Sequence, residues 1–222
     1  MFLGDHGWFD KRFIYEDSFQ MPFLARYPNG GIKPGSVSKD IVQNVDFGAT
    51  MLDVAGLATP SYMQGKSFKD SLTGTTPMDW DQLAYHRYWM HDDPIHHAYA
   101  HYGVRDRRYK LIYWCVFPST CISMPFADRE RRYNLGFGLP GTQLGGEEKQ
   151  WELFDTEKDP FELFDVFSEA EYKHVREQMI KKLETKMMQI GDEWVHDVSE
   201  LEEIGLRPSE ELLRAKRDAV NH

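Results

Sequence analysis

The sequence predicts an α/β fold in which a strand–loop–helix unit is followed by a smaller antiparallel sheet with one packed helix. Three observations support this prediction. The first 74 residues contain an apolar run, a turn-rich loop and a helical segment, in that order. Short runs rich in aromatic residues come next, and one long amphipathic stripe lies near the C-terminal end.

Residues 1–74 form the first predicted part of the chain. Residues 21–27 (MPFLARY) predict a short buried strand, and residues 28–35 (PNGGIKPG) predict a loop because glycine, proline and asparagine favour turns. Residues 46–55 predict a helix with Asp46 as its N-cap and Gly56 as its stop signal. Strand, loop and helix in this order are typical of an α/β domain.

Residues 75–191 form the second predicted part. Strands are expected at residues 83–89, 98–105 and 109–114, and the charged turn between the last two predicts an antiparallel hairpin or meander. Residues 117–150 are rich in proline, glycine and charged residues and show no sustained period, so we interpret them as a long insertion.

A helix is predicted at residues 169–191. Apolar side chains recur there at steps of three and four, which is the pattern of a helix that packs on a sheet: Tyr172, Val175, Met179, Leu183, Met187 and Ile190. We interpret this stripe as core. Residues 192–222 form a polar tail in which Pro208 and Ser209 open a short charged helix.

Composition limits the partners of this chain. Its 222 residues carry 26 Lys and Arg against 36 Asp and Glu, a net charge of -10, whereas a nucleic-acid groove must neutralise phosphates. No apolar run approaches the ~20 residues that cross a bilayer, and the apolar start is too short for a secretory signal peptide. We therefore expect no nucleic-acid partner and no membrane segment, and the compartment stays open.

The most informative residues stand at the start of the chain. Gly4-Asp5-His6-Gly7 follows residues 1–3, an apolar stub that we interpret as the end of a strand. A carboxylate beside an imidazole at such a position can bind a divalent cation. On its own, however, so short a motif is more typical of a structural loop.

The context of this motif supports a resemblance to a known family. Lys11 follows it, and an ordered series of short motifs continues along the chain: Tyr15-Glu16, Met21-Pro22-Phe23, Tyr27-Pro28 and Pro34-Gly35. In this order and spacing, the series resembles the C-terminal half of the catalytic domain of the sulfatase family.

Further segments extend the resemblance to about residue 190. They are residues 44–47 (NVDF), 51–56 (MLDVAG), 63–67 (MQGKS), 101–105 (HYGVR), 108–112 (RYKLI), 151–155 (WELFD), 158–160 (KDP) and 162–163 (EL). The insertion at about residues 117–150 and the tail after residue 191 are outside it.

The resemblance implies the C-terminal part of an alkaline-phosphatase-like α/β/α sandwich, followed by a small antiparallel-sheet subdomain with a packed helix. Residues 1–74 would belong to the catalytic α/β domain and residues 75–191 to the C-terminal subdomain. In this family the active site lies at the C-terminal ends of the strands.

The resemblance also assigns site residues. Asp5 and His6 fall on the family's second pair of metal ligands, commonly for calcium, and Lys11 falls on the lysine that contacts the sulfate group. A hard cation prefers a carboxylate oxygen, so His6 is the weaker ligand of the pair. Lys11 would place a compact positive charge against a sulfate oxygen and stabilise charge that grows on the leaving group.

Five histidines lie close together in the sequence, in the part that the resemblance places beside the active-site mouth: His86, His91, His96, His97 and His101. Their spacing forms no recognised metal-ligand set, and we select His101 as the candidate substrate contact. Arg105 either binds an anionic substrate group or, as the favoured alternative, pairs with a nearby acid.

The family's nucleophile is absent from this sequence. It is a formylglycine made from cysteine or serine in the motif Cys-x-Pro-x-Arg, and paired metal-binding aspartates precede it. Cys115 and Cys121 stand in no such context, because Pro118 and Pro125 come too late. We therefore interpret both cysteines as ordinary semi-buried residues and expect no sulfatase activity from the isolated chain.

The function implied by the resemblance is hydrolysis of a sulfate ester of a carbohydrate or an aryl compound. Formylglycine would attack sulfur, and the metal would polarise the sulfate oxygens. The chain would then be a truncated gene product, a split-gene partner of a separate N-terminal chain, or an incomplete gene model. The parent enzyme would be exported or lysosomal, as is usual in this family.

Two alternatives stay open. One is a phosphodiesterase or phosphonate monoester hydrolase of the same superfamily, whose metal ligands also include a neighbouring aspartate and histidine. The other is a non-catalytic fragment that binds a sulfated glycan or a partner chain. Upstream sequence would separate the first from a sulfatase, and a calcium titration with a sulfatase assay would test the second.

Overall fold

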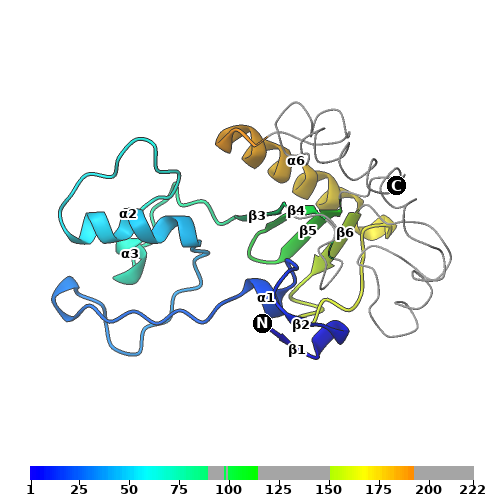
Figure 1. The fold of residues 1–222 in the computed structure, drawn as a ribbon, viewed down its shortest axis with the longest axis horizontal. Helices are drawn as coiled ribbons and strands as arrows, with labels where there is room; N and C mark the ends of the chain where they lie inside the picture. Colours follow the sequence, from blue (N-terminus) through cyan, green and yellow to red (C-terminus); the bar gives the residue numbers. More distant parts are fainter. Residues whose placement is uncertain (90–97, 99, 115–150, 193–222) are drawn as a thin grey trace, which may run out of the picture.

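A four-stranded antiparallel sheet forms the centre of the computed structural model, which describes residues 1–89, 98, 100–114 and 151–192. The strand order is β3-β4-β5-β6, and neighbours pair antiparallel throughout (Figure 1). The strands are β3 (Ala84–Tyr88), β4 (His101–Arg105), β5 (Tyr109–Trp114) and β6 (Trp151–Asp155). The predicted antiparallel meander is confirmed, with β6 as an additional strand.

The charged turn between β4 and β5 is held by its own aspartate. Asp106 Oδ1 accepts the backbone N–H groups of Arg108 at 2.9 Å and Tyr109 at 2.7 Å. Its Oδ2 pairs with Lys182 on the helix that covers the sheet. Aspartate commonly closes turns in this way, because its short side chain reaches the backbone two or three residues on.

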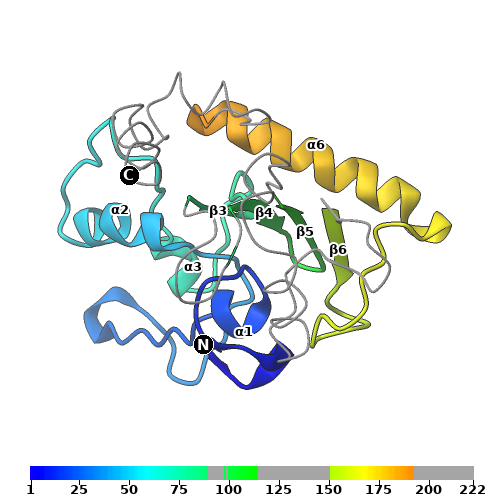
Figure 2. The same cartoon turned by 45° about the vertical axis from the view of Figure 1, so that its right-hand side comes forward.

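One face of the sheet is covered by α6 (Lys173–Ile190), which follows the short 3₁₀ helix η3 (Ala170–Tyr172) (Figure 2). Four residues of the predicted stripe are buried in the core under this helix: Tyr172, Met179, Leu183 and Met187. The helix ends at Gly191, whose φ of 67° suits glycine and closes the last turn. The prediction of a helix over residues 169–191 is confirmed.

The opposite face is covered by the N-terminal segment, residues 1–20. This segment contains β1 (Phe2–Leu3), the 3₁₀ turn η1 (Asp5–Gly7), β2 (Phe9–Asp10) and α1 (Glu16–Phe19). Its buried aromatic and aliphatic side chains form a second core with Ala98 and with residues of the sheet: Phe2, Trp8, Phe13, Ile14, Tyr15, Ala98, Ile112, Trp114 and Phe154.

Strand alternation explains the two cores. On β5, Leu111 and Tyr113 pack with α6, whereas Ile112 and Trp114 pack with the N-terminal segment. On β4, Gly103 faces the same segment, and a Cβ atom there would lie 2.4 Å from Ile14 Cδ1. Glycine therefore allows the segment to approach the sheet backbone closely.

A third region, residues 21–83, lies to one side of the sheet and contains α2 (Asn44–Val54) and α3 (Lys69–Leu72) (Figure 1). The predicted helix is present, but its predicted N-cap is wrong. Gln43 is the N-cap, and Asp46 is the third helical residue, whose Oδ2 accepts the Gln43 N–H at 2.8 Å. Asp46 Oδ1 also accepts the Lys66 N–H at 3.0 Å, so its carboxylate joins the helix to the following loop.

The predicted strand at residues 21–27 is wrong. This segment has no regular structure and is largely exposed, with Leu24 at 95%. Pro22 has no N–H to donate, and no strand of the described residues pairs with the segment. An apolar run of this length forms a strand only where a partner strand is available.

Several predictions lie outside the described residues. These are the insertion at 117–150, the helix in the tail, both cysteines, His91, His96 and His97. The boundary between residues 74 and 75 stays a prediction. Within the described part, no helix combines the length and apolar character needed to span a membrane.

Leu183→Ala tests the packing of α6 on the sheet. Leu183 is fully buried, so the truncation should lower the free energy of unfolding by about 2–5 kcal/mol, as measured by urea denaturation. Met188→Ala on the exposed side of the same helix is the control and should change it by less than about 0.5 kcal/mol. Equal effects of the two variants would contradict this packing.

Candidate functional site

The candidate metal ligands lie at the tip of a hairpin formed by β1 and β2. The register pairs Phe2 with Asp10 and Leu3 with Phe9. Three backbone hydrogen bonds close the turn: Gly4 N to Trp8 O and Trp8 N to Asp5 O, both at 2.9 Å, and Gly7 N to Gly4 O at 3.0 Å. The turn therefore holds Asp5 and His6 next to each other at one end of the hairpin, and Lys11 directly follows its other end.

The turn has an unusual backbone. Gly4, His6 and Gly7 all have positive φ, and His6 has φ 54° and ψ 15°. A residue with a side chain pays about 1–2 kcal/mol for the left-handed region. Surrounding contacts must offset this cost at His6.

Aromatic rings on two sides supply such contacts. The His6 imidazole stacks on the Tyr15 ring with 4.8 Å between centroids and 12° between planes. The Phe2 ring meets it edge-on at 6.0 Å. The imidazole is consequently half-buried, whereas the Asp5 carboxylate is exposed and accepts the Leu3 N–H at 3.4 Å.

This pair fits part of a divalent-cation site. Asp5 offers an anionic oxygen and His6 an imidazole nitrogen, whereas calcium takes six to eight ligands. Within residues 1–89, 98, 100–114 and 151–192, no group of three or more His, Cys, Asp and Glu side chains could hold a metal. Further ligands could be backbone carbonyl oxygens, water molecules or side chains outside the described residues.

Lys11 is exposed beyond the end of β2. The residue before it, Asp10, has φ 75° and pairs with Arg12 at 3.3 Å. The Arg12 guanidinium thus has an acid partner. The structure places Lys11 on the same hairpin as Asp5 and His6, one residue past the Phe2–Asp10 pair at its base.

Tyr15, against which His6 stacks, is anchored on the sheet. Its hydroxyl donates to Glu152 Oε2 of β6 at 2.9 Å, and Trp114 Nε1 of β5 donates to the same oxygen at 3.0 Å. Burial, together with the negative charge of Glu152, raises the pKa of Tyr15 well above its usual value. Tyr15 therefore stays a hydrogen-bond donor through the physiological range.

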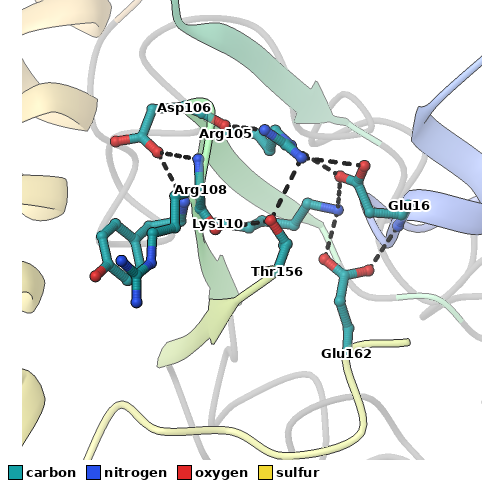
Figure 3. A network of polar contacts seen from close by, with 8 residues as sticks. Glu16, Arg105, Asp106, Arg108, Lys110, Thr156 and Glu162 are labelled. Carbon is teal, nitrogen blue, oxygen red and sulfur yellow. Dashed lines mark hydrogen bonds and ion pairs between the residues drawn. The ribbon is translucent and has the colours of Figure 1, made fainter. Parts of the chain in front are cut away.

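The next residue, Glu16, is anchored by a buried charge network (Figure 3). Lys110 of β5 is fully buried, and its Nζ lies 2.7 Å from Glu16 Oε1 and 2.6 Å from Glu162 Oε1. The second Glu162 oxygen accepts the Glu16 backbone N–H at 2.6 Å. Arg105 Nε donates to Glu16 Oε1 at 3.1 Å, which confirms the favoured prediction of a structural acid partner for Arg105.

The two carboxylates of this network shift in opposite directions. At Glu16, burial would raise the pKa, but the charges of Lys110 and Arg105 outweigh burial and lower it. At Glu162, burial dominates and raises the pKa despite Lys110. Two acids that share one ammonium in a buried place cannot both be stabilised equally as anions.

His101 lies on β4 among aromatic rings and is fully buried. Its ring centroid is 4.6 Å from that of Trp114, 5.3 Å from Tyr88 and 5.5 Å from His86. The ring therefore belongs to the interior on the side of the N-terminal segment. Its role as a substrate contact stays a prediction.

Sequence reasoning did not identify the anchoring residues Tyr15, Lys110, Glu152 and Glu162 as a group. One signal was available, because strand alternation puts Lys110 on the same face of β5 as Ile112 and Trp114. A lysine on a buried face requires an acid partner. The identity of that partner depends on contacts between distant segments.

Comparisons with known proteins agree with the resemblance seen in the motifs. A family model described as N-sulphoglucosamine sulphohydrolase, C-terminal, matches residues 4–123. An N-acetylglucosamine-6-O-sulfatase of Bacteroides thetaiotaomicron is 38% identical over 194 residues, which cover 86% of this chain and 29% of that protein. An ulvan-active sulfatase of Formosa agariphila is 30% identical over 207 residues, covering 86% of this chain and 33% of that protein.

A solved structure is also similar. It is described as BT4656 in complex with its substrate D-glucosamine-2-N,6-O-disulfate, and it aligns with a TM-score of 0.69 and 35% sequence identity. The alignment covers 89% of this chain and 34% of that one, so the chain spans about a third of the length of these relatives. The similarity confirms the predicted fold class, the C-terminal part of an alkaline-phosphatase-like sulfatase fold.

The half-buried His86 should make stability depend on pH. Burial, aided by the positive charge of Lys110, lowers the pKa of His86 to about 4. Folding therefore favours the neutral imidazole. The resulting contribution to the free energy of unfolding is fully present above the unfolded-state pKa of about 6.5 and is lost as pH falls toward 4. We expect the free energy of unfolding to fall by about 3 kcal/mol over this window, measured by urea denaturation at each pH.

His86→Phe should remove this pH-dependent fall in the free energy of unfolding, because phenylalanine does not titrate. The exposed His174 provides the control, and His174→Gln should leave the pH dependence unchanged. The same slope between pH 7 and 4 in wild type and His86→Phe would contradict the assignment.

Proposed function

The chain belongs to the N-sulphoglucosamine sulphohydrolase C-terminal family, and from this premise we propose that the whole protein hydrolyses a sulfate ester on a sulfated amino sugar. The supporting observation is the 38% identity to an N-acetylglucosamine-6-O-sulfatase over 86% of this chain. The solved relative, with D-glucosamine-2-N,6-O-disulfate as its substrate, supports the same substrate class.

The contribution of this chain to the reaction centres on its hairpin. Asp5 and His6 would supply two ligands of a divalent cation, for which we propose calcium. When bound, that cation supplies positive charge to the sulfate oxygens. Lys11 would place its ammonium against a sulfate oxygen or the leaving oxygen and so offset negative charge that develops there.

The nucleophile of the reaction is not provided by the 222 residues, which contain no Cys-x-Pro-x-Arg motif. The sulfatase family implies a formylglycine in the full enzyme. In this proposal, the described part of the chain contributes two metal ligands, the Lys11 ammonium that contacts the sulfate, and the framework that holds them. We therefore propose that residues upstream of this sequence complete the active site.

The function is tested by joining the chain to its upstream coding sequence and assaying 6-O-sulfated N-acetylglucosamine. Release of sulfate by the joined protein, and none by the isolated chain, would support the proposal. Turnover by the isolated chain would contradict it, since no nucleophile of this family is present. Hydrolysis of an aryl phosphonate in preference to any sulfate ester would favour the phosphonate hydrolase alternative.

Asp5→Ala and His6→Ala should affect metal binding to different extents. Calcium prefers carboxylate oxygen, and a water molecule can replace a neutral imidazole more easily than an anionic ligand. In the joined protein, calorimetric titration with calcium should show a larger loss of affinity for Asp5→Ala than for His6→Ala. Unchanged calcium affinity in Asp5→Ala would refute its role as a ligand.

Lys11→Ala should slow turnover without destabilising the fold. Removal of one preorganised charge contact to a developing anion costs about 10²-fold to 10³-fold in rate. Because Lys11 is exposed, the melting temperature should change by no more than about two degrees. Lys33→Ala, at another exposed loop lysine, is the control and should keep full activity. Near-normal turnover in Lys11→Ala would contradict this role and show that Lys11 is an ordinary surface lysine.

A further inference from the structure

We propose that the loop after β6 is an interface for the upstream part of the same protein, and that Phe161, Leu163 and Phe164 form its apolar contact surface. The inference rests on the proposed function, because it takes the whole protein to extend upstream of these 222 residues. It does not depend on the metal or on the sulfate.

Three large apolar side chains of this loop face solvent within a stretch of four residues. Phe161 is 68% exposed, Leu163 62% and Phe164 70%. A single exposed apolar residue is ordinary, whereas a group of this kind is typical of a surface that another part of a protein covers. The loop therefore carries apolar area for which the described part of the chain provides no cover.

The residue between them, Glu162, is buried. Its Oε1 lies 2.6 Å from Lys110 Nζ, and its Oε2 accepts the Glu16 N–H at 2.6 Å. Glu162 has φ 53°, in the left-handed region that residues with a side chain seldom adopt. The buried carboxylate thus holds the backbone in a conformation that leaves the apolar neighbours on the outside.

Hydrogen bonds fix the rest of the loop. The Phe164 N–H donates to Asp159 Oδ2 at 2.8 Å, and the Val166 N–H donates to Leu153 O of β6 at 2.9 Å. Asp165 Oδ1 accepts the Leu153 N–H at 2.9 Å, so the loop is tied back to the strand that precedes it. An ordered loop loses little conformational freedom when a partner covers it, which favours binding.

The position of the N-terminus favours the upstream chain as the occupant. The Met1 amino group donates to the Asp17 carbonyl on α1. The residue before Asp17, Glu16, is the one whose N–H binds Glu162 of the loop. Any residue joined to the nitrogen of Met1 therefore begins beside the helix that contacts the loop. Two views place the loop after β6 beside the hairpin of β1 and β2 (Figure 1 and Figure 2).

The upstream chain is also long enough to cover this surface. The family model that matches this chain describes a C-terminal part, and the chain spans about a third of the length of its sulfatase relatives. A whole protein of that length has about two thirds of its residues upstream. A second copy of the chain is the alternative occupant, but a contact between copies gives no reason for the N-terminus to lie beside the loop.

The first measurement is hydroxyl-radical footprinting, in which mass spectrometry gives the oxidation rate of each side chain. The joined protein described above and the isolated chain are labelled in parallel. Phe161, Leu163 and Phe164 should be oxidised several-fold more slowly in the joined protein, because the upstream part covers them. Met188, which is 74% exposed on α6, is the control and should keep its rate.

The second measurement is thermal unfolding of Phe161→Ser, Phe164→Ser and the control Met188→Ser. In the joined protein, either phenylalanine variant should lower the melting temperature by several degrees, because a buried apolar side chain is lost. In the isolated chain the same substitutions should have little effect, since the side chains are exposed there. Met188→Ser should have little effect in both proteins.

The outcomes separate this inference from the proposed function. Equal oxidation rates of the loop in both proteins would overturn the interface, whether or not the joined protein releases sulfate. Protection of the loop that appears in the isolated chain as its concentration rises would assign the surface to a second copy and overturn the upstream occupant. A protected loop in a joined protein that releases no sulfate would support the interface and contradict the proposed function.

The joined protein decides alone if the isolated chain does not fold. Phe161→Ser and Phe164→Ser should then destabilise the joined protein more than Met188→Ser does. Equal melting temperatures of the three variants would overturn the interface.

Discussion

Lys110 connects three segments that are far apart in the sequence through a largely buried charge network. Its ammonium extends from β5 to Glu16 on α1 and to Glu162 in the loop after β6 (Figure 3). Replacing such a group by a well-packed apolar residue can be neutral, but removing one partner leaves an uncompensated buried charge and costs about 3–5 kcal/mol. The network therefore contributes geometry more than net stability. It determines where the N-terminal segment meets the sheet, because Glu16 binds through both its side chain and its N–H.

The sheet separates two cores that differ in their apolar residues. On one face, the α6 core contains mainly aliphatic, methionine and tyrosine side chains, and the buried acid Asp155 accepts hydrogen bonds from Arg108 and the Tyr172 hydroxyl. On the other face, the core contains the buried acid Glu152, the ammonium of Lys110 and several aromatic rings. Buried polar groups require specific partners, so they restrict the arrangement more than apolar contacts do. The candidate site lies on the side of this second core.

Local patterns predicted much of the fold, whereas contacts between distant residues could not be predicted. Alternation of apolar residues with a period of two predicted the hairpin of β4 and β5. Apolar residues at steps of three and four predicted the helix α6. The strand predicted around Leu24 failed because a strand also needs a partner, which no local pattern specifies. Asp5, His6 and Lys11 were selected from motif order. Tyr15 and Glu152 are 137 positions apart, and with 36 acidic residues in the chain, no spacing rule selects this pair.

The backbone at His6 indicates that its side chain has a role. The same turn contains Gly4 and Gly7 with positive φ, so glycine is used where the left-handed region is needed without a side chain. At His6 the sequence keeps an imidazole in that region, although glycine would remove a strain of about 1–2 kcal/mol. Its stack on Tyr15 offsets part of that strain. Strain of this kind is typical of sites where position matters more than stability.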